Sequence, residues 1–342
     1  MEKTRLIYMD IARAIGIVLV VIGHYIPDDS PDWYVVLRDA IYKFHMPLFM
    51  FLSGYVYWAT KKPMKYGTFV WKKFQRLMIP CFFVSVVIIT IKLVTEKELS
   101  VENPVTSVAF REMFYLPVAG YFLWFVYCLF LIFLIIPFFH TYKQLMFLLV
   151  VSLIVFFIPV DFPKLFCMAE MKRNFIYFVL GCVVFDRINI RRSMDRIYFP
   201  VAFFIFIGVY ILKSNIDNRL INGLITLVLA LTGIVFAVNM SKYMSRKTAA
   251  ICKLLSGISV YSYTIYLFHT TFEGFAKAAV KTDKISAIVD LCQKDLRFII
   301  CAVAVISAGI ICPVVLHETA VRYCKPLSFL LGTKFAGKSN HT

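Results

Sequence analysis

The sequence lacks the features that mark several large classes of protein. Its 342 residues contain no internal repeat, no heptad pattern, no low-complexity tract and no long polar segment that could form a soluble appendage. These absences exclude a repeat array and a coiled coil. We therefore expect one domain that covers residues 1–342.

The nine cysteines also lack a pattern. They are scattered, mostly within apolar stretches, and no two have the spacing of metal ligands. This scatter disfavours a zinc site or a disulfide framework, and it is typical of small buried side chains in a membrane protein. We expect no bound metal.

Apolar residues, in contrast, are abundant. Hydrophobic residues make up 61% of the chain and aromatic residues 17%, and the mean hydropathy is +0.78. A soluble domain does not carry so much apolar surface, so most of this protein must lie in a bilayer. The first apolar run has no small-residue cleavage site, so we expect it to remain as a helix and not to be removed as a signal peptide.

The apolar runs have roughly the length that a helix needs to cross about 30 Å of hydrocarbon. We predict an all-α integral membrane protein, a bundle of about ten transmembrane helices. The predicted spans are residues 7–26, 35–58, 75–94, 119–139, 144–160, 174–187, 197–213, 220–240, 256–273 and 296–316.

The basic residues set the orientation of the bundle. With the N-terminus in the cytoplasm, the cytoplasmic segments hold 21 basic and 4 acidic residues, and the outer segments hold 15 of each. The whole net charge of +17 thus falls on one side, as the positive-inside rule expects. We predict that both termini are cytoplasmic. The basic loops then give no reason to expect nucleic acid as a partner.

The first predicted span contains three ionisable residues, Asp10, Arg13 and His24. Asp10 and Arg13 are one turn apart, and His24 follows Arg13 on the same helix face, about 16 Å further along the axis. In the predicted orientation His24 lies near the outer surface. Ionisable groups within a span are functional by default. The alternative is a structural ion pair with an interfacial histidine.

Two further histidines reach the same depth as His24. His45, in FHMPLFMFLSGYVYW, enters the membrane from the outer side, and His269, in SVYSYTIYLFHT, lies in the outer half of a span that runs outward. The alternative for His45 is a satisfied histidine in a packing helix. The remaining histidines, at 140, 317 and 341, fall on the cytoplasmic side.

A basic cluster, Lys72, Lys73 and Arg76, lies at the cytoplasmic end of the third predicted span. Such cations commonly extend along the interface toward water. They can also bind phosphate, which Arg grips with two parallel hydrogen bonds.

Several of these motifs, taken together, resemble the acyltransferase 3 family of membrane-bound O-acyltransferases. The stretch DIARAIGIVLVVIGH is similar to the family's first-helix signature, and Asp10, Arg13 and His24 match it residue by residue. The segments FHMPLFMFLSGY, FLWFVYCL and YTIYLFH resemble its second-helix, fourth-helix and late motifs, in the same order. The motifs fall within residues 5–270 and are most similar to the fucose 4-O-acetylase-like branch. One departure is Lys73-x-x-Arg76, where the family has two arginines.

The resemblance implies transfer of an acetyl group from cytoplasmic acetyl-CoA to a sugar hydroxyl on the outer side, on a lipid-linked or surface glycan, in a bacterial inner membrane. It assigns His24 as the general base, with Asp10 and Arg13 also in the catalytic motif. Arg13, Lys73 and Arg76 would hold the donor. His45, His269 and Trp124 would face the acceptor. No metal is implied, and direct transfer is preferred to an acyl-histidine intermediate.

Two other classes of function stay open at this stage. A secondary transporter could use Asp10, Arg13 and His24 as a proton relay, although the paired Gly/Pro-interrupted helices of such proteins are not found. A non-catalytic member could flip or sense a glycan. The sequence identifies neither the acceptor sugar nor the oligomeric state.

Overall fold

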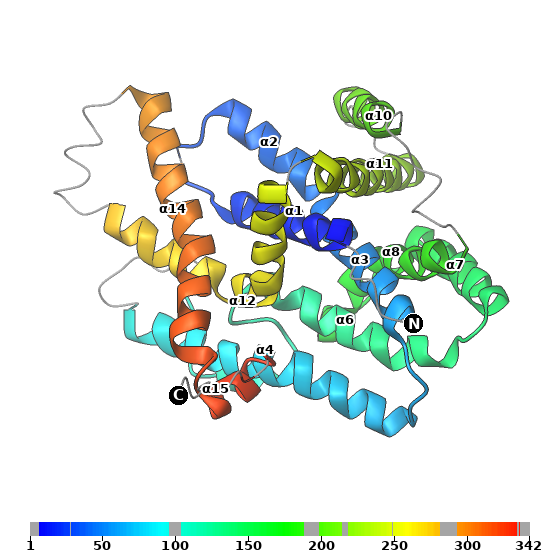
Figure 1. The fold of residues 1–342 in the computed structure, drawn as a ribbon, viewed down its shortest axis with the longest axis horizontal. Helices are drawn as coiled ribbons and strands as arrows, with labels where there is room; N and C mark the ends of the chain where they lie inside the picture. The colour runs from blue at the N-terminus through cyan, green and yellow to red at the C-terminus, as the bar shows by residue number, and fades with distance from the viewer. Residues whose placement is uncertain are drawn as a thin grey trace.

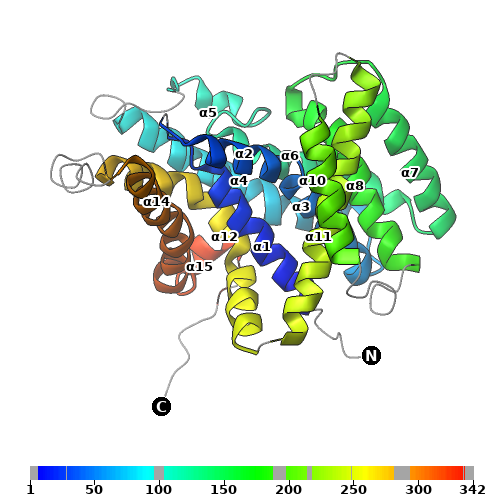
Figure 2. The ribbon, with the colours of Figure 1, turned by 90° about the horizontal axis from the view of Figure 1, so that it is seen from above.

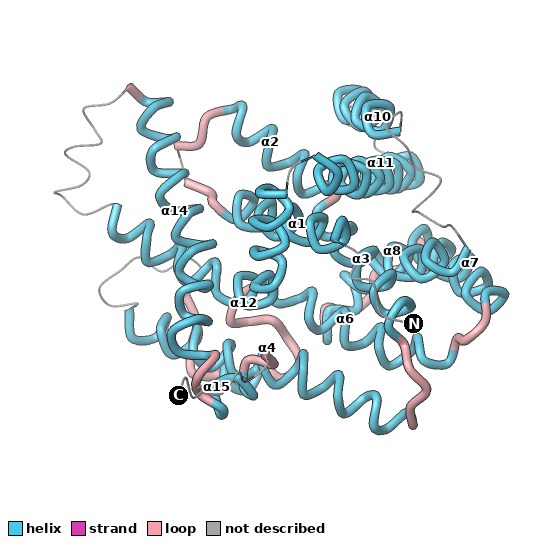
Figure 3. Tube along the Cα trace, in the orientation of Figure 1, coloured by secondary structure: helices cyan, strands magenta, loops and turns pink. Residues whose placement is uncertain are grey.

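The computed structural model describes residues 7–27, 29–95, 104–187, 198–213, 218–247, 249–280, 293–333 and 335. Within these ranges the regular structure is helical and contains no strand (Figure 3). The predicted all-α fold is confirmed for this part of the chain.

The described elements follow one another in a simple order. They are α1 (Ile7–His24), α2 (Asp32–Tyr42), α3 (His45–Thr60), α4 (Tyr66–Thr95), α5 (Ala109–Glu112), η1 (Tyr121–Leu123), α6 (Trp124–Ile135), η2 (Ile136–Phe138), α7 (Tyr142–Phe157), η3 (Leu165–Cys167), α8 (Met168–Arg187), α10 (Tyr198–Leu212), α11 (Arg219–Lys247), α12 (Ala249–Val280), α14 (Lys294–Leu316), the π-helix η4 (His317–Val321) and α15 (Lys325–Leu330).

Six of the described helical segments are long and apolar enough to cross a membrane, judged by length and composition. They are Ile7–His24, Tyr66–Thr95, Tyr121–Phe138, Arg219–Arg246, Ala249–Val280 and Lys294–Val321. The helices α7 and α10 are apolar but shorter. Each predicted span overlaps a described helix, whereas the count of ten stays a prediction. The predicted loop at 188–196, the first residue of the predicted span 197–213, and residues 281–292 of the predicted loop at 274–295 lie outside the described residues.

The second predicted span, 35–58, differs from the structure because it is divided into two helices. Helix α2 ends at Tyr42 and α3 begins at His45, and Phe44 between them has φ −137° and ψ −19°, outside the helical region. Pro47 explains the break, because a proline ring in an unbroken helix would clash with the carbonyl group four residues earlier. In the first turn of α3 that clash does not arise. The break places His45 at the start of a helix.

Helix α1 lies in the middle of the molecule (Figure 1). It packs against α3, α11, α12 and α14. After a 90° turn it is seen between the α12–α14 pair on one side and α10–α11 on the other (Figure 2). Half of its 18 residues are buried, from Met9 to Gly23. A helix that is buried on several sides holds its polar groups in fixed positions.

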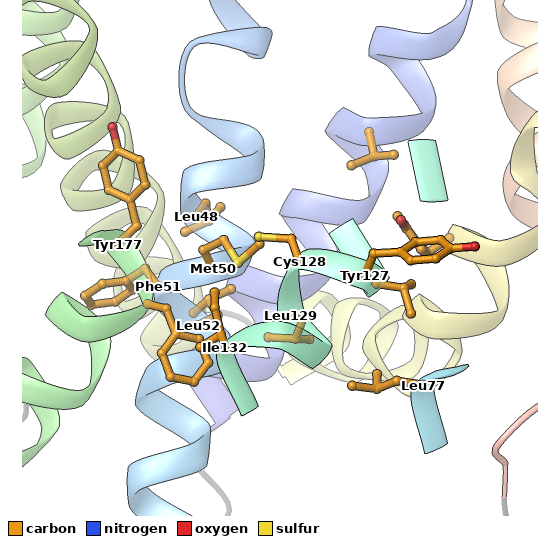
Figure 4. Packing of buried hydrophobic residues seen from close by; sticks show 14 of the residues in the cluster. Leu48, Met50, Phe51, Leu52, Leu77, Tyr127, Cys128, Leu129, Ile132 and Tyr177 are labelled. Carbon is orange, nitrogen blue, oxygen red and sulfur yellow. The ribbon is translucent and has the colours of Figure 1, made fainter. Parts of the chain in front are cut away.

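Two glycines let α3 and α8 touch backbone to backbone. A Cβ atom added at Gly54 would collide with the Phe178 carbonyl oxygen, and one at Gly181 would collide with the Phe51 carbonyl oxygen. Small residues at such crossings allow the close approach on which helix packing in membranes depends. Near the contact, Met50 of α3 lies beside Cys128 of α6, and Tyr177 of α8 belongs to the same buried cluster (Figure 4). This packing fixes the helix that carries His45.

Helix α4 contains Pro80, which cannot donate the helical hydrogen bond to the carbonyl oxygen of Arg76. The hydroxyl group of Tyr263, on α12, donates to that oxygen at 3.2 Å. Gly332, with φ +62°, approaches the same carbonyl group from the C-terminal segment, where a Cβ atom would lie 2.9 Å from the oxygen. The proline thus connects α4 to α12 at the level of the predicted donor cations.

Candidate functional site

A cavity of about 1310 Å³ lies where the ends of nine described helices meet. It is lined by C-terminal residues of α1, α2, α4, α7 and α12 and by N-terminal residues of α3, α6, α8 and α11. The chain thus returns to this end of the bundle repeatedly, where some helices end and others begin. The cavity therefore lies at one end of the bundle, the end that carries His24 and His45.

His24 is the last residue of α1 and lines this cavity. Its Nδ1 atom lies 2.8 Å from the carbonyl oxygen of Val20. Because a carbonyl oxygen only accepts hydrogen bonds, we assign the ring proton to Nδ1, which leaves Nε2 with its lone pair free to act as a base. The C-terminal position adds a second effect, because the partial negative charge of a helix C-terminus stabilises a protonated imidazole.

His269, on α12, packs directly against His24. The two ring centroids are 4.9 Å apart and the rings are nearly perpendicular, at 83°. His269 is completely buried, and its Nδ1 lies 3.1 Å from the Ile265 carbonyl oxygen and 2.9 Å from that of Tyr266. Its Nε2 has no hydrogen-bond partner among the described residues. The structure thus brings together two of the histidines that the sequence placed at one depth.

His45 lies close to the histidine pair, with the Tyr42 ring in contact with both His45 and His24. It is buried and lines the cavity, and its Nδ1 lies 2.9 Å from the Ile41 carbonyl oxygen. The ring centroid of Tyr42 lies 4.9 Å from that of His45 and 6.1 Å from that of His24. Tyr42 therefore contacts both histidines.

Aromatic residues complete the surroundings of the histidine pair. Phe122, whose ring lies 5.2 Å from His269 and 6.3 Å from His24, lines the cavity with Trp124 and Tyr266. The Tyr266 hydroxyl donates to the Phe122 carbonyl oxygen. The sequence prediction included Trp124 but missed Tyr42, Phe122 and Tyr266. Phe122 and Tyr266 lie inside the FLWFVYCL and YTIYLFH motifs, which is the signal that could have identified them.

Asp10 and Arg13 lie near the other end of α1. The Arg13 guanidinium is 3.5 Å from the Asp10 carboxylate, and both side chains are largely buried. Neither residue is among the described residues that line the cavity. The predicted ion pair is present, and it lies about 16 Å from His24 along the helix axis.

Lys73 and Arg76 lie apart from the histidine pair. The Lys73 ammonium lies 3.7 Å from the centre of the Phe133 ring and 5.4 Å from that of Phe69. The Arg76 side chain is exposed. Neither lines the cavity within the described part of the chain. The predicted donor cations and the predicted catalytic histidines thus occupy separate places in the fold.

Within the described part of the chain, metal ligands are not gathered at this site. Among the described residues, no three His, Cys, Asp or Glu side chains are placed so that they could hold a metal ion. The chemistry that the site can perform with its own side chains is proton transfer by imidazole.

Comparisons with known proteins identify the family of the chain. A family model described as an acyltransferase domain matches residues 6–318. The chain is 35% identical over 96 residues to the nodulation protein NolL of Sinorhizobium fredii, and 35% identical over 88 residues to that of Mesorhizobium japonicum. The matched segments cover 27% and 24% of this chain and 26% and 24% of those proteins. No solved structure matches.

Proposed function

Because the chain belongs to this acyltransferase family, we propose that it transfers an acetyl group from cytoplasmic acetyl-CoA to a hydroxyl group of a glycan on the outer side of the membrane. An acyltransferase needs a base for the attacking hydroxyl group, a place for the acceptor and a place for the donor. The observation that supports the proposal most strongly is His24, a histidine with an engaged Nδ1 that lines a large cavity beside a second histidine.

In the proposed reaction His24 is the general base. Its Nε2 takes the proton of the acceptor hydroxyl while the hydroxyl oxygen attacks the thioester carbonyl carbon. The carbon–sulfur bond then breaks, the ester stays on the acceptor, and the proton passes from His24 to the departing thiolate. The Val20 carbonyl oxygen keeps the ring in place through both steps, because Nδ1 remains a donor whether the ring is neutral or charged.

The donor enters from the opposite end in this proposal. Arg13, Lys73 and Arg76 hold the phosphates of acetyl-CoA, because the nucleotide end of that molecule is polyanionic. Its pantetheine arm then runs through the bundle toward His24. The separation of about 16 Å along α1 between Arg13 and His24 suits a long, thin arm.

The proposed setting is a bacterial inner membrane, with about ten spans and both termini in the cytoplasm. The 21 basic residues on the cytoplasmic side, against 15 outside, support this orientation. His45, His269 and Trp124 are proposed to orient His24 or the acceptor, and membrane lipid surrounds the bundle.

The variant His24→Gln tests the proposal. Purified at wild-type level, it should still bind CoA and lose acetyl transfer by about 10²–10⁴-fold, the range for removal of a positioned acid–base group. His140→Gln, at an exposed histidine far along the chain, is the matched control. Near-normal turnover by His24→Gln would remove His24 from the mechanism.

A further inference from the structure

The cavity carries more positive charge than the topology of the chain explains. Its charged lining consists of six cationic residues, Lys43, Lys92, Lys172, Arg173, Arg219 and Lys277, and three acidic ones, Asp161, Glu170 and Glu273. All nine belong to segments predicted on the outer side, where basic and acidic residues balance overall, 15 of each. The positive-inside rule therefore does not account for the excess of three positive charges.

Three of these cations gather on the wall formed by α8 and α11. Lys172 is buried, and its ammonium group donates to the carbonyl oxygens of Ile158 at 2.7 Å and Val160 at 2.6 Å. These neutral partners satisfy its hydrogen bonds without cancelling its charge. The positive charges of Arg219 and Arg173 both act on Lys172, and the negative charge of Asp161 partly offsets them.

The acidic residues on this wall neutralise only part of that charge. The Asp161 carboxylate is 98% exposed and lies 3.5 Å from the Arg219 guanidinium, a surface pair that water and salt screen strongly. The Glu170 carboxylate accepts a hydrogen bond from the Tyr121 hydroxyl at 2.5 Å and keeps its negative charge, so the wall holds three cations against two carboxylates. Arg219 is also the first residue of α11, where the helix dipole disfavours a cation. A wall built in this way attracts an anion.

We propose that the acceptor bound in this cavity carries an oxyanion, a phosphate or a carboxylate group, which contacts Lys172, Arg173 and Arg219 while its reacting hydroxyl group lies at His24. This inference rests on the proposed function of the same cavity. The volume of about 1310 Å³ exceeds the roughly 300–1,000 Å³ of ordinary small-molecule sites. An acceptor of that size can place its anionic group and its hydroxyl group against different walls.

The first test of the inference measures whether the natural acetylated product is negatively charged. Membranes that contain the protein are supplied with acetyl-CoA labelled in the acetyl group, and the labelled saccharide is extracted and applied to an anion-exchange resin. It should be retained. Loss of retention after phosphatase or mild acid identifies a phosphate, and loss after carboxyl reduction identifies a carboxylate. A labelled product that is neutral would overturn the inference, whereas the absence of any labelled saccharide would contradict the proposed function instead.

Substitutions then locate the anion. With the extracted acceptor, Arg173→Gln and Arg219→Gln should each raise the KM for the acceptor about tenfold, the loss expected for one charged hydrogen bond. The KM for acetyl-CoA should not change, and added salt should reduce the difference from wild type. Lys164→Gln, at an exposed residue just before α8 that does not line the cavity, is the matched control. An equal effect in the control, an unchanged acceptor KM, or a rise in the donor KM would show that this wall does not hold the acceptor.

Discussion

At the scale of single residues, His24, His45 and His269 share one local design. In each, Nδ1 faces the carbonyl oxygen of the residue four positions earlier: Val20 for His24, Ile41 for His45 and Ile265 for His269. A backbone carbonyl group, in the same helix for His24 and His269 and at the end of α2 for His45, therefore holds each imidazole and leaves Nε2 as the basic nitrogen. What distinguishes the three is access, because His24 and His45 line the cavity, whereas His269 lies behind His24.

The position of His269 predicts an indirect effect on catalysis. His269→Ala should lower kcat about tenfold to hundredfold and leave the KM for acetyl-CoA unchanged, because the His24 ring loses its packing partner and small displacements of a catalytic group are costly. His269→Asn, which keeps a polar group of similar size, should recover part of the loss. Steady-state kinetics of the two His269 variants and of His24→Gln provide the comparison of kcat and KM. A loss in His269→Ala that equals the loss in His24→Gln would make His269 a direct participant.

The two proposed donor cations of α4, Lys73 and Arg76, differ in what they contact, and this predicts different responses. Arg76→Ala should weaken CoA binding more than Arg76→Lys does, since the lysine keeps the charge and loses only the paired hydrogen bonds of the guanidinium. Lys73→Arg should be tolerated, because an arginine can also stack on the Phe133 ring that the Lys73 ammonium now contacts. Binding of CoA and of dephospho-CoA provides the measurement. Unchanged binding of both ligands in Arg76→Ala would mean that the nucleotide lies elsewhere.

At the scale of helices, apolar length predicted where helices form but not where they end. Helix α12 covers Ala249–Val280, whereas the predicted span covered 256–273, since polar residues continue a helix beyond the hydrocarbon. The division of 35–58 depends on Pro47 and on how α2 packs, which hydropathy does not encode. That His24, His45 and His269 gather at one end of the bundle could be predicted from helix direction alone. The contact of Tyr42 with two histidines depends on tertiary packing, so the sequence could not predict it.

The α3–α8 contact predicts a strong effect of one added methyl group. Gly54→Ala or Gly181→Ala should destabilise the protein by about 1–3 kcal/mol, because the new Cβ meets backbone atoms that cannot move aside independently. Gly208→Ala on α10 is the control, since a Cβ there meets nothing within 4 Å. Thermal unfolding of the purified variants in one detergent measures the difference. If all three variants unfold at the wild-type temperature, α3 and α8 are less tightly packed than the structure indicates.

At the scale of the whole molecule, the proposed acceptor site and the proposed donor cations lie toward opposite ends of the bundle. The cavity gathers helix ends from residue 20 to residue 278 of the chain, while the proposed donor cations lie near the other ends of α1 and α4. In the proposed function, a donor and an acceptor from different compartments meet within such a bundle. That argument requires the helix ends at the cavity to face outward, and the orientation is open to direct measurement.

The orientation can be measured by labelling single cysteines with a reagent that cannot cross the membrane. Ser30→Cys, in the loop between α1 and α2, should react in intact cells, whereas Pro63→Cys, between α3 and α4, should react only after the membrane is opened, because the basic loops stay inside. Cysteines at positions 283 and 193, both outside the described residues, should behave like 30 and 63 respectively. The native Cys324 is exposed and predicted to be cytoplasmic, so in the unmodified chain it serves as an internal control. Reaction of position 63 in intact cells would invert the orientation and place the histidine pair on the cytoplasmic side.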